Sequence, residues 1–202
     1  MEENDPRQVI IDYICRPQGP IIEEKMQPTP AGAKHAWRGI TRASGGLGAK
    51  ESTIQFLQQR SMPDRQLHLV TFEDEEGRQV SWFCCLLLEP SGQWIFAGGA
   101  GGARVEEMPK RENPWVNMGG GWKKNLFWAG GRVLDNGLNV VRVRLVAENG
   151  IILEDTVQDG IVMFVSNETL PLPVQVELYD GAGTLVGTHM FPRHLPRIPH
   201  EG

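Results

Sequence analysis

Six apolar segments follow one another at intervals of about ten residues in the last third of the chain, with turn-forming residues between them. The segments span residues 127–133, 139–147, 151–157, 161–165, 174–179 and 184–191. Such spacing is typical of antiparallel sandwiches and barrels, because each short strand needs a turn before it can pair with the next. We therefore predict an antiparallel β-sandwich over residues 126–191.

The loop at residues 148–150 selects between two registers for the strands on either side. A two-residue Asn-Gly turn would place Leu145 opposite Glu154. A three-residue loop with a left-handed glycine instead places Leu145 opposite Leu153 and Arg144 opposite Glu154. The second register separates apolar from charged side chains, and we predict it.

This register has one misfit. It places Asp155 opposite Val143, on the apolar face of the hairpin. A β-bulge near Asp155 would relieve the conflict, since a bulge redirects side chains locally.

The first part of the chain predicts a smaller α+β domain over residues 1–97. Asp5 and Pro6 suit an N-cap and a first turn, and they precede a short helical pattern over residues 7–15. A second helical pattern covers residues 31–42. The four expected antiparallel strands are residues 52–60, 66–73, 79–88 and 93–97. In the second of these both faces are apolar, which predicts a sheet covered on both sides.

The remaining residues predict linkers. Residues 98–125 are rich in glycine and tryptophan and lack a clear period, so we expect a connector between the two domains. Residues 192–202 carry three prolines and no periodicity, which is typical of a tail.

Charge and cysteine content narrow the class of protein. The net charge is −5, and the acidic excess is spread over both halves. Because no basic cluster stands out, we expect neither nucleic acid nor a membrane surface as a partner. The acidic N-terminus lacks the apolar segment of a secretory signal. Three cysteines, two of them adjacent, do not make a disulfide framework, so we expect a cytoplasmic protein.

Two partial resemblances accompany these patterns. Two helices, then strands ending in a Gly92-Gln93-Trp94 element, make residues 5–97 resemble the nuclear-transport-factor-two-like (cystatin-like) superfamily. That resemblance implies an α+β fold and no particular activity. Residues 126–191 are similar to bacterial immunoglobulin-like accessory domains, mainly through the strand and turn at residues 176–183. This resemblance implies an immunoglobulin-like sandwich.

Aromatic side chains beside glycines provide the strongest ligand-site candidate. The candidate ligand-binding residues are Trp94, Trp115, Trp122, Phe127 and Trp128. Flat rings with glycines beside them can stack on a sugar, a base or a peptide. The alternative is a domain junction sealed by tryptophan, with glycines where backbones pack closely. We favour the junction.

Other chemistry has less support. Residues 98–102 follow a strand as phosphate-binding loops do, but lack the Gly-Lys-Ser/Thr ending. Cys84 or Cys85 could pair with His68 as a nucleophile, yet an apolar strand makes a thiol unreactive. The acidic residues at 154, 155 and 159 lack the spacing of a calcium loop. We expect no catalytic residue, no metal site and no cofactor.

The sequence leaves three hypotheses about function. The first is a non-catalytic binding or protein-interaction module of a bacterial-type soluble protein. The second is a small-ligand carrier or enzyme that uses a pocket in the N-terminal sheet, with His68 or Glu73 as polar groups. The third is a homodimer formed through exposed sheet edges. A deep pocket lined by the first half of the chain, holding a polar side chain with a strongly shifted pKa, would support the second hypothesis. An exposed apolar patch at a sheet edge or at the junction, without a pocket, would support the first.

Overall fold

The computed structural model describes residues 4–17, 21–22, 41–42, 46–103, 112–123 and 125–191. In this part of the chain the protein is mainly β, as predicted, with one short α-helix, α1 (Pro6–Ile14). Three antiparallel sheets contain four, three and four strands. Two further strands, β1 (Ile21–Ile22) and β2 (Thr41–Arg42), pair only with each other, and a single 3-10 turn covers Glu51–Thr53.

The three sheets are built from strands that are neighbours in space but not always in sequence. Sheet I, in spatial order, contains β3 (Gln55–Met62), β4 (Arg65–Glu73), β5 (Gln79–Leu88) and β6 (Trp94–Ala103). Sheet II contains β11 (Ile161–Ser166), β8 (Leu126–Leu134) and β7 (Trp115–Lys123). Sheet III contains β10 (Ile152–Thr156), β9 (Val140–Val146), β12 (Val174–Asp180) and β13 (Leu185–Phe191).

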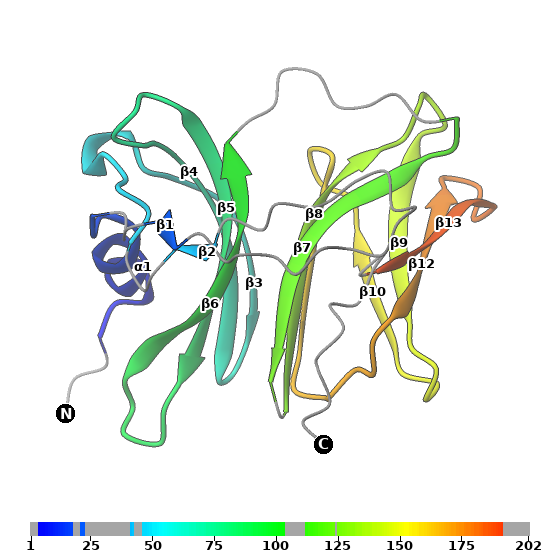
Figure 1. The fold of residues 1–202 in the computed structure, drawn as a ribbon. Coiled ribbons are helices and arrows are strands. Elements are labelled where there is room, and N and C mark those ends of the chain that lie inside the picture. Colours follow the sequence, from blue (N-terminus) through cyan, green and yellow to red (C-terminus); the bar gives the residue numbers. More distant parts are fainter. Residues whose placement is uncertain are drawn as a thin grey trace, which may run out of the picture.

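The helix and the three sheets lie in successive layers, in the order α1, sheet I, sheet II and sheet III (Figure 1). Each gap between layers contains an apolar cluster of its own. Sheets I and II each bury side chains on both faces, so they form the interior of the stack.

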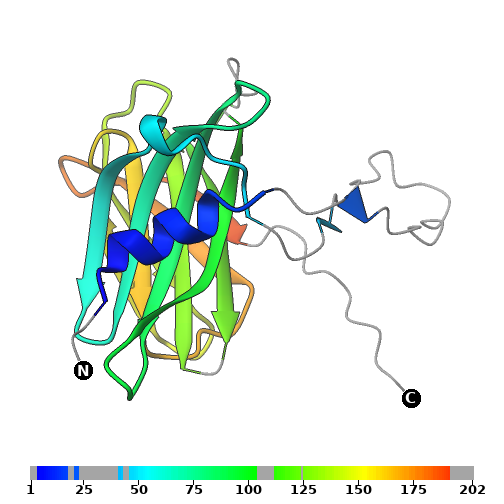
Figure 2. The same cartoon turned by 90° about the vertical axis from the view of Figure 1, so that its left-hand side faces the viewer.

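Helix α1 runs across the strands of sheet I (Figure 2). It starts as predicted: the Asp5 carboxylate accepts a hydrogen bond from the Arg7 backbone N–H at 2.9 Å, and Pro6 occupies the first turn. Ile10 and Ile14 are fully buried against the sheet. The helix therefore covers one face of sheet I mainly through Ile10 and Ile14, which lie one helical turn apart.

Sheet I is covered on both faces, which confirms the prediction from its second strand. Val70 and Phe72 pack toward α1, while Leu67 and Leu69 pack toward sheet II. The adjacent cysteines of β5 divide in the same way, Cys84 toward α1 and Cys85 toward sheet II. This alternation follows from the two-residue period of a strand.

The predicted register of the β9–β10 hairpin is confirmed. Leu145 pairs with Leu153 and Arg144 pairs with Glu154, and Gly150 has a φ of 85° in the connecting loop. The Arg144 Nε atom lies 3.2 Å from a carboxylate oxygen of Glu154. The turn and the apolar pattern together determined this pairing.

The predicted bulge at Asp155 is wrong. Asp155 pairs with Val143 without a shift in register. Its carboxylate accepts a hydrogen bond from the Met163 N–H at 2.8 Å and forms an ion pair with Arg60 of sheet I at 3.0 Å. The misfit is therefore relieved by partners from two other sheets, which the hairpin alone could not reveal.

Part of the expected connector forms strands. β6 continues through the glycines to Ala103, and β7 covers Trp115–Lys123. Glycine is a poor strand former in isolation, but packing between sheets can outweigh that preference. The strand expected at residues 52–60 begins only at Gln55, after the 3-10 turn.

Two expected segments lie mostly or wholly outside the described residues. Of the helix expected over residues 31–42, the last two residues form β2, and residues 31–40 lie outside the described part of the chain. The tail at residues 192–202 also lies outside it. The division of the chain into domains stays a prediction.

Candidate functional site

Glycines and aromatic rings alternate where sheet I faces sheet II. The Trp128 indole lies over two glycines: an added Cβ would come within 3.3 Å of it at Gly98 and within 2.9 Å at Gly121. The Phe83 ring lies over Gly130, where an added Cβ would come within 2.2 Å of a ring carbon and collide with it. Rings thus rest on glycine backbone at this interface. A Cβ at Gly121 or Gly130 would collide with them. A Cβ at Gly98 would need the Trp128 ring to shift by a few tenths of an ångström.

Arg65 joins sheet I to sheet II at one end of this interface. Arg65 is only 6% exposed, and its Nη1 atom donates to the backbone carbonyls of Asn125 at 2.8 Å and Ser166 at 3.0 Å. Those carbonyls belong to the β7–β8 turn and to the end of β11. One cation from sheet I therefore binds two chain segments of sheet II, with its charge balanced by neighbouring Asp64.

Side chains change from apolar to polar towards the other end. On β4, Leu69 is followed on the same face by Thr71, and on β5 Phe83 is preceded by Ser81. On β8 the series ends in Arg132. The two sheets diverge in this direction (Figure 1). The interface is therefore wedge-shaped: Arg65 joins the two sheets at one end, and the sheets separate at the other end, called the open end below.

A cleft of about 720 Å³ occupies the open end. Three buried apolar residues, Leu69, Phe83 and Ile161, line it and are called its floor below. The polar side chains that line it, called its rim below, are Gln55, Gln58, Thr71, Gln79, Ser81, Asn117, Arg132 and Asp159. Gly102 also lines it, and an added Cβ there would meet nothing within 4 Å. The cleft is lined by residues from both halves of the chain.

The predicted aromatic site residues are distributed over different layers. Trp94 packs against α1, Trp128 between sheets I and II, and Phe127 between sheets II and III. Trp122 is 46% exposed, and Trp115 is partly buried at the start of β7. These five residues do not form one surface, and none of them lines the cleft. The glycine contacts of Trp128 place its ring where sheets I and II pack, and the interpretation as a domain junction stays a prediction.

His68 lies on the face of sheet I that α1 covers, opposite to the cleft. It is 2% exposed, its ring stands edge-on to Phe56, and its Nε2 atom lies 2.8 Å from Gln66 Oε1. Burial, with a smaller contribution from the Arg7 charge, lowers the pKa of His68 to about 4. His68 therefore cannot serve as a polar group of the cleft.

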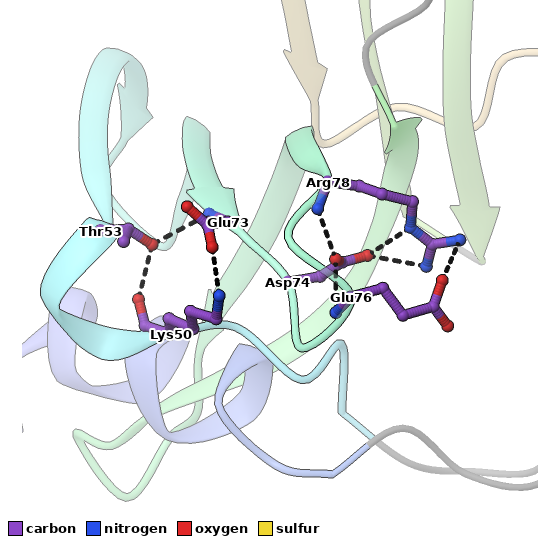
Figure 3. A network of polar contacts seen from close by, with 6 residues as sticks. All are labelled: Lys50, Thr53, Glu73, Asp74, Glu76 and Arg78. Atoms are coloured by element: carbon purple, nitrogen blue, oxygen red, sulfur yellow. Dashed lines mark hydrogen bonds and ion pairs between the residues drawn. The ribbon is translucent and has the colours of Figure 1, made fainter.

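Glu73, the other polar group considered for a pocket, belongs to a network at the end of β4 (Figure 3). Its carboxylate pairs with Lys50, and its N–H donates to the Thr53 hydroxyl at 2.9 Å. The same hydroxyl donates to the Lys50 carbonyl at 2.7 Å. These contacts attach the 3-10 turn to sheet I.

Asp74 organises the β4–β5 turn in the same network (Figure 3). Its buried carboxylate accepts hydrogen bonds from the N–H groups of Glu76 and Arg78 and from the Arg78 guanidinium, all between 2.8 and 3.0 Å. Burial would raise the pKa of Asp74, but these bonds hold it below its usual value. The carboxylate is saturated with donors, which is typical of a structural role.

His68 and Cys84, considered above as a nucleophilic pair, are cross-strand neighbours on β4 and β5, and both are buried. Burial strongly raises the pKa of the Cys84 thiol, so its thiolate form is disfavoured. The described residues contain no group of three or more His, Cys, Asp or Glu side chains arranged to hold a metal ion. Nowhere in them does a helix combine the length and the apolar character that crossing a bilayer requires.

A smaller hollow lies beside α1. Tyr13 stacks on Phe96 with ring centroids 3.7 Å apart, and Arg16 lies over the Tyr13 ring. The hollow, of about 400 Å³, is bounded by these residues and Asp12. Its rings already stack on each other, so they offer little free face to a ligand.

Comparison with known proteins found no matching family model, no similar curated protein and no similar solved structure. The resemblances of residues 5–97 and 126–191 therefore stay predictions. The cleft between sheets I and II is the site that the geometry itself offers.

Proposed function

We propose that this protein is a non-catalytic binding module whose ligand occupies the cleft between sheets I and II. The observation that carries the proposal is the cleft itself. Its volume of about 720 Å³ falls within the range of about 300–1,000 Å³ that is usual for small-molecule sites. An apolar floor with a rim of polar groups is also usual for such sites.

Binding is favoured over catalysis by the groups that line the cleft. No histidine or cysteine is among the described residues that line it, so no imidazole is present there to activate the hydroxyls of Thr71 and Ser81. A nucleophile needs such a base within hydrogen-bond reach. The cleft therefore supports retention of a ligand and not its covalent conversion.

The proposal includes the finer fold and location. In it, residues 126–191 act as an immunoglobulin-like sandwich and residues 1–97 as an α+β sheet domain, with the ligand held between them. The Phe127-containing cluster between sheets II and III supports the sandwich. Free Cys15, Cys84 and Cys85 support a reducing, cytoplasmic setting.

Saturation-transfer NMR against a library of small polar and amphiphilic compounds tests the proposal. Gly102→Phe should abolish binding of the compounds that wild type binds, because the ring would enter the open cleft. Gly181→Phe is the matched control, since Gly181 lies in the β12–β13 turn and has room for a side chain. Binding that survives Gly102→Phe, or a library without any bound compound, would contradict the proposal.

A further inference from the structure

The hydrogen-bonding groups of the cleft select among ligand classes. Resting on the proposed function, we infer that the cleft binds a neutral, hydroxyl-rich ligand of the saccharide class. Three observations support this inference: most polar side chains of the rim are uncharged, Gln58 Oε1 has no hydrogen-bond partner among the described residues, and the one cation of the described lining is matched by one anion.

Uncharged polar groups dominate the rim. They are Gln55, Gln58, Thr71, Gln79, Ser81 and Asn117. Each amide or hydroxyl offers both a donor and an acceptor. A sugar hydroxyl also donates and accepts, so it can bind such a side chain in either direction. A rim of this kind therefore matches a ligand that carries many hydroxyls.

Gln58 offers a specific acceptor. Its Nε2 atom donates to the backbone carbonyl of Gln158 at 2.8 Å, and this fixes the orientation of the amide because only nitrogen can donate to a carbonyl. Its Oε1 atom is buried and has no hydrogen-bond partner among the described residues. A buried acceptor without a partner is unfavourable. Gln58 lines the cleft, but its Oε1 atom has almost no open surface, so the side chain must shift for a ligand hydroxyl to reach and satisfy it.

The charge balance argues against ionic ligands. Arg132 is the cation of the described lining, and Asp159 is its anion. The two lie near each other in the fold, because Arg132 pairs with Ile161, two residues after Asp159. Phosphate recognition uses several donors or cations without a competing carboxylate. A polyanion would therefore meet repulsion as well as attraction at this mouth.

The apolar floor suits a sugar better than a base or a lipid. Phe83 is the one aromatic side chain among the described lining residues, and it is 8% exposed, so it presents little face for stacking a base. Leu69 and Ile161 are also nearly buried. A lipid tail would leave the polar rim without partners. A pyranose can bind the rim through its hydroxyls while its C–H groups contact Leu57, which also lines the cleft and is exposed.

Saturation-transfer NMR with a defined probe panel tests the ligand class. The saccharide probes are glucose, galactose, mannose, N-acetylglucosamine, maltose and cellobiose. The comparison probes are an acetylated and amidated Ala-Gly-Ala tripeptide, nonanoate and inorganic phosphate. We expect transfer to at least one saccharide, none to phosphate or nonanoate, and loss of the saccharide signal in Gly102→Phe.

A matched pair of variants tests the assigned acceptor. Gln58→Met should weaken saccharide binding about tenfold, the effect of losing one hydrogen bond. Gln59→Met is the control, because Gln59 is the next residue of β3 and pairs with His68 on the opposite face. It should leave the dissociation constant unchanged. Equal effects of both variants would contradict the role of Gln58.

The outcomes separate this inference from the proposed function. If the tripeptide, nonanoate or phosphate binds in a Gly102-dependent way and no saccharide does, the ligand class is wrong and the cleft remains a binding site. If library compounds bind only outside the cleft, or none binds, both proposals fail. Saccharide binding that depends on Gly102 and Gln58 supports both.

Discussion

The two sheet–sheet interfaces of this protein are filled in different ways. Between sheets II and III, aliphatic side chains and phenylalanine from both sheets form one continuous buried cluster. Between sheets I and II, Trp128 and Phe83 lie on glycines, and the apolar cluster gives way to a cleft. The first interface is suited to holding layers together, and the second leaves room for a ligand.

The difference shows how side-chain size shapes an interface. Branched aliphatic residues on both walls fill the space between two sheets evenly. A large ring on one wall needs a small residue on the other, so alternating rings and glycines fix the spacing at a few points. Where the rings end, at Ser81 and Gly102, polar side chains and glycine take their place, and the cleft begins.

Neighbouring residues of β8 allow the two interfaces to be compared directly. Phe127 is fully buried between sheets II and III, and Trp128 is 4% exposed between sheets I and II. Phe127→Ala and Trp128→Ala should each lower the free energy of unfolding by about 4 kcal/mol, because each removes a buried ring. Urea unfolding measures the effect. Trp122→Ala is the control and should cost under about 1 kcal/mol, since Trp122 is 46% exposed. A small effect of Trp128→Ala would show that the ring does not hold sheets I and II together.

The face of sheet I that α1 covers differs from both sheet–sheet interfaces because it buries a histidine, His68, so its contribution to stability depends on pH. The folded pKa of His68, about 4, lies below its ordinary value of 6.5. The stability it contributes is therefore complete above pH 6.5 and is lost as the pH falls towards 4, by about 3 kcal/mol in total. Urea unfolding from pH 7 to 4 should show this loss, and His68→Leu should remove it. Asp74, whose pKa is lowered from 3.8, titrates below this window. An unchanged profile in His68→Leu would refute the assignment.

Two glycines test where the interface closes. Gly130→Ala should destabilise the protein by about 2 kcal/mol, because its Cβ would collide with the Phe83 ring. Gly102→Ala should be neutral or stabilise by up to about 1 kcal/mol, because its Cβ meets open space and alanine restricts the unfolded chain. Thermal and urea unfolding compare the two variants. Similar effects at both positions would mean that the interface does not divide into packed and open parts.

Local patterns predicted much of the secondary structure. β5 was predicted with its observed bounds, and α1 with its Asp5 cap. The β9–β10 register followed from a loop and an alternation of apolar residues. These features depend on neighbours in sequence or across one hairpin, where turn geometry and periodicity act directly.

The site was harder to predict because its residues have no shared local signal. Gln58, Ser81 and Arg132 lie far apart in sequence and are ordinary strand residues. The one signal was the glycine content of β6 and β7, which indicated loops when taken alone. Read together with nearby tryptophans, glycines within strands indicate close packing of sheets, and so mark where two layers meet.

The sequence by itself determined the β-rich class, the helix cap, the turns and the faces of individual strands, because these depend on backbone preferences and on a two-residue alternation. Only the tertiary structure decided that Asp155 pairs with Arg60, that Trp128 lies on glycines from two sheets, and that a cleft opens beside Gly102. These features depend on which faces of distant strands meet, and that choice minimises exposed apolar surface over the whole chain.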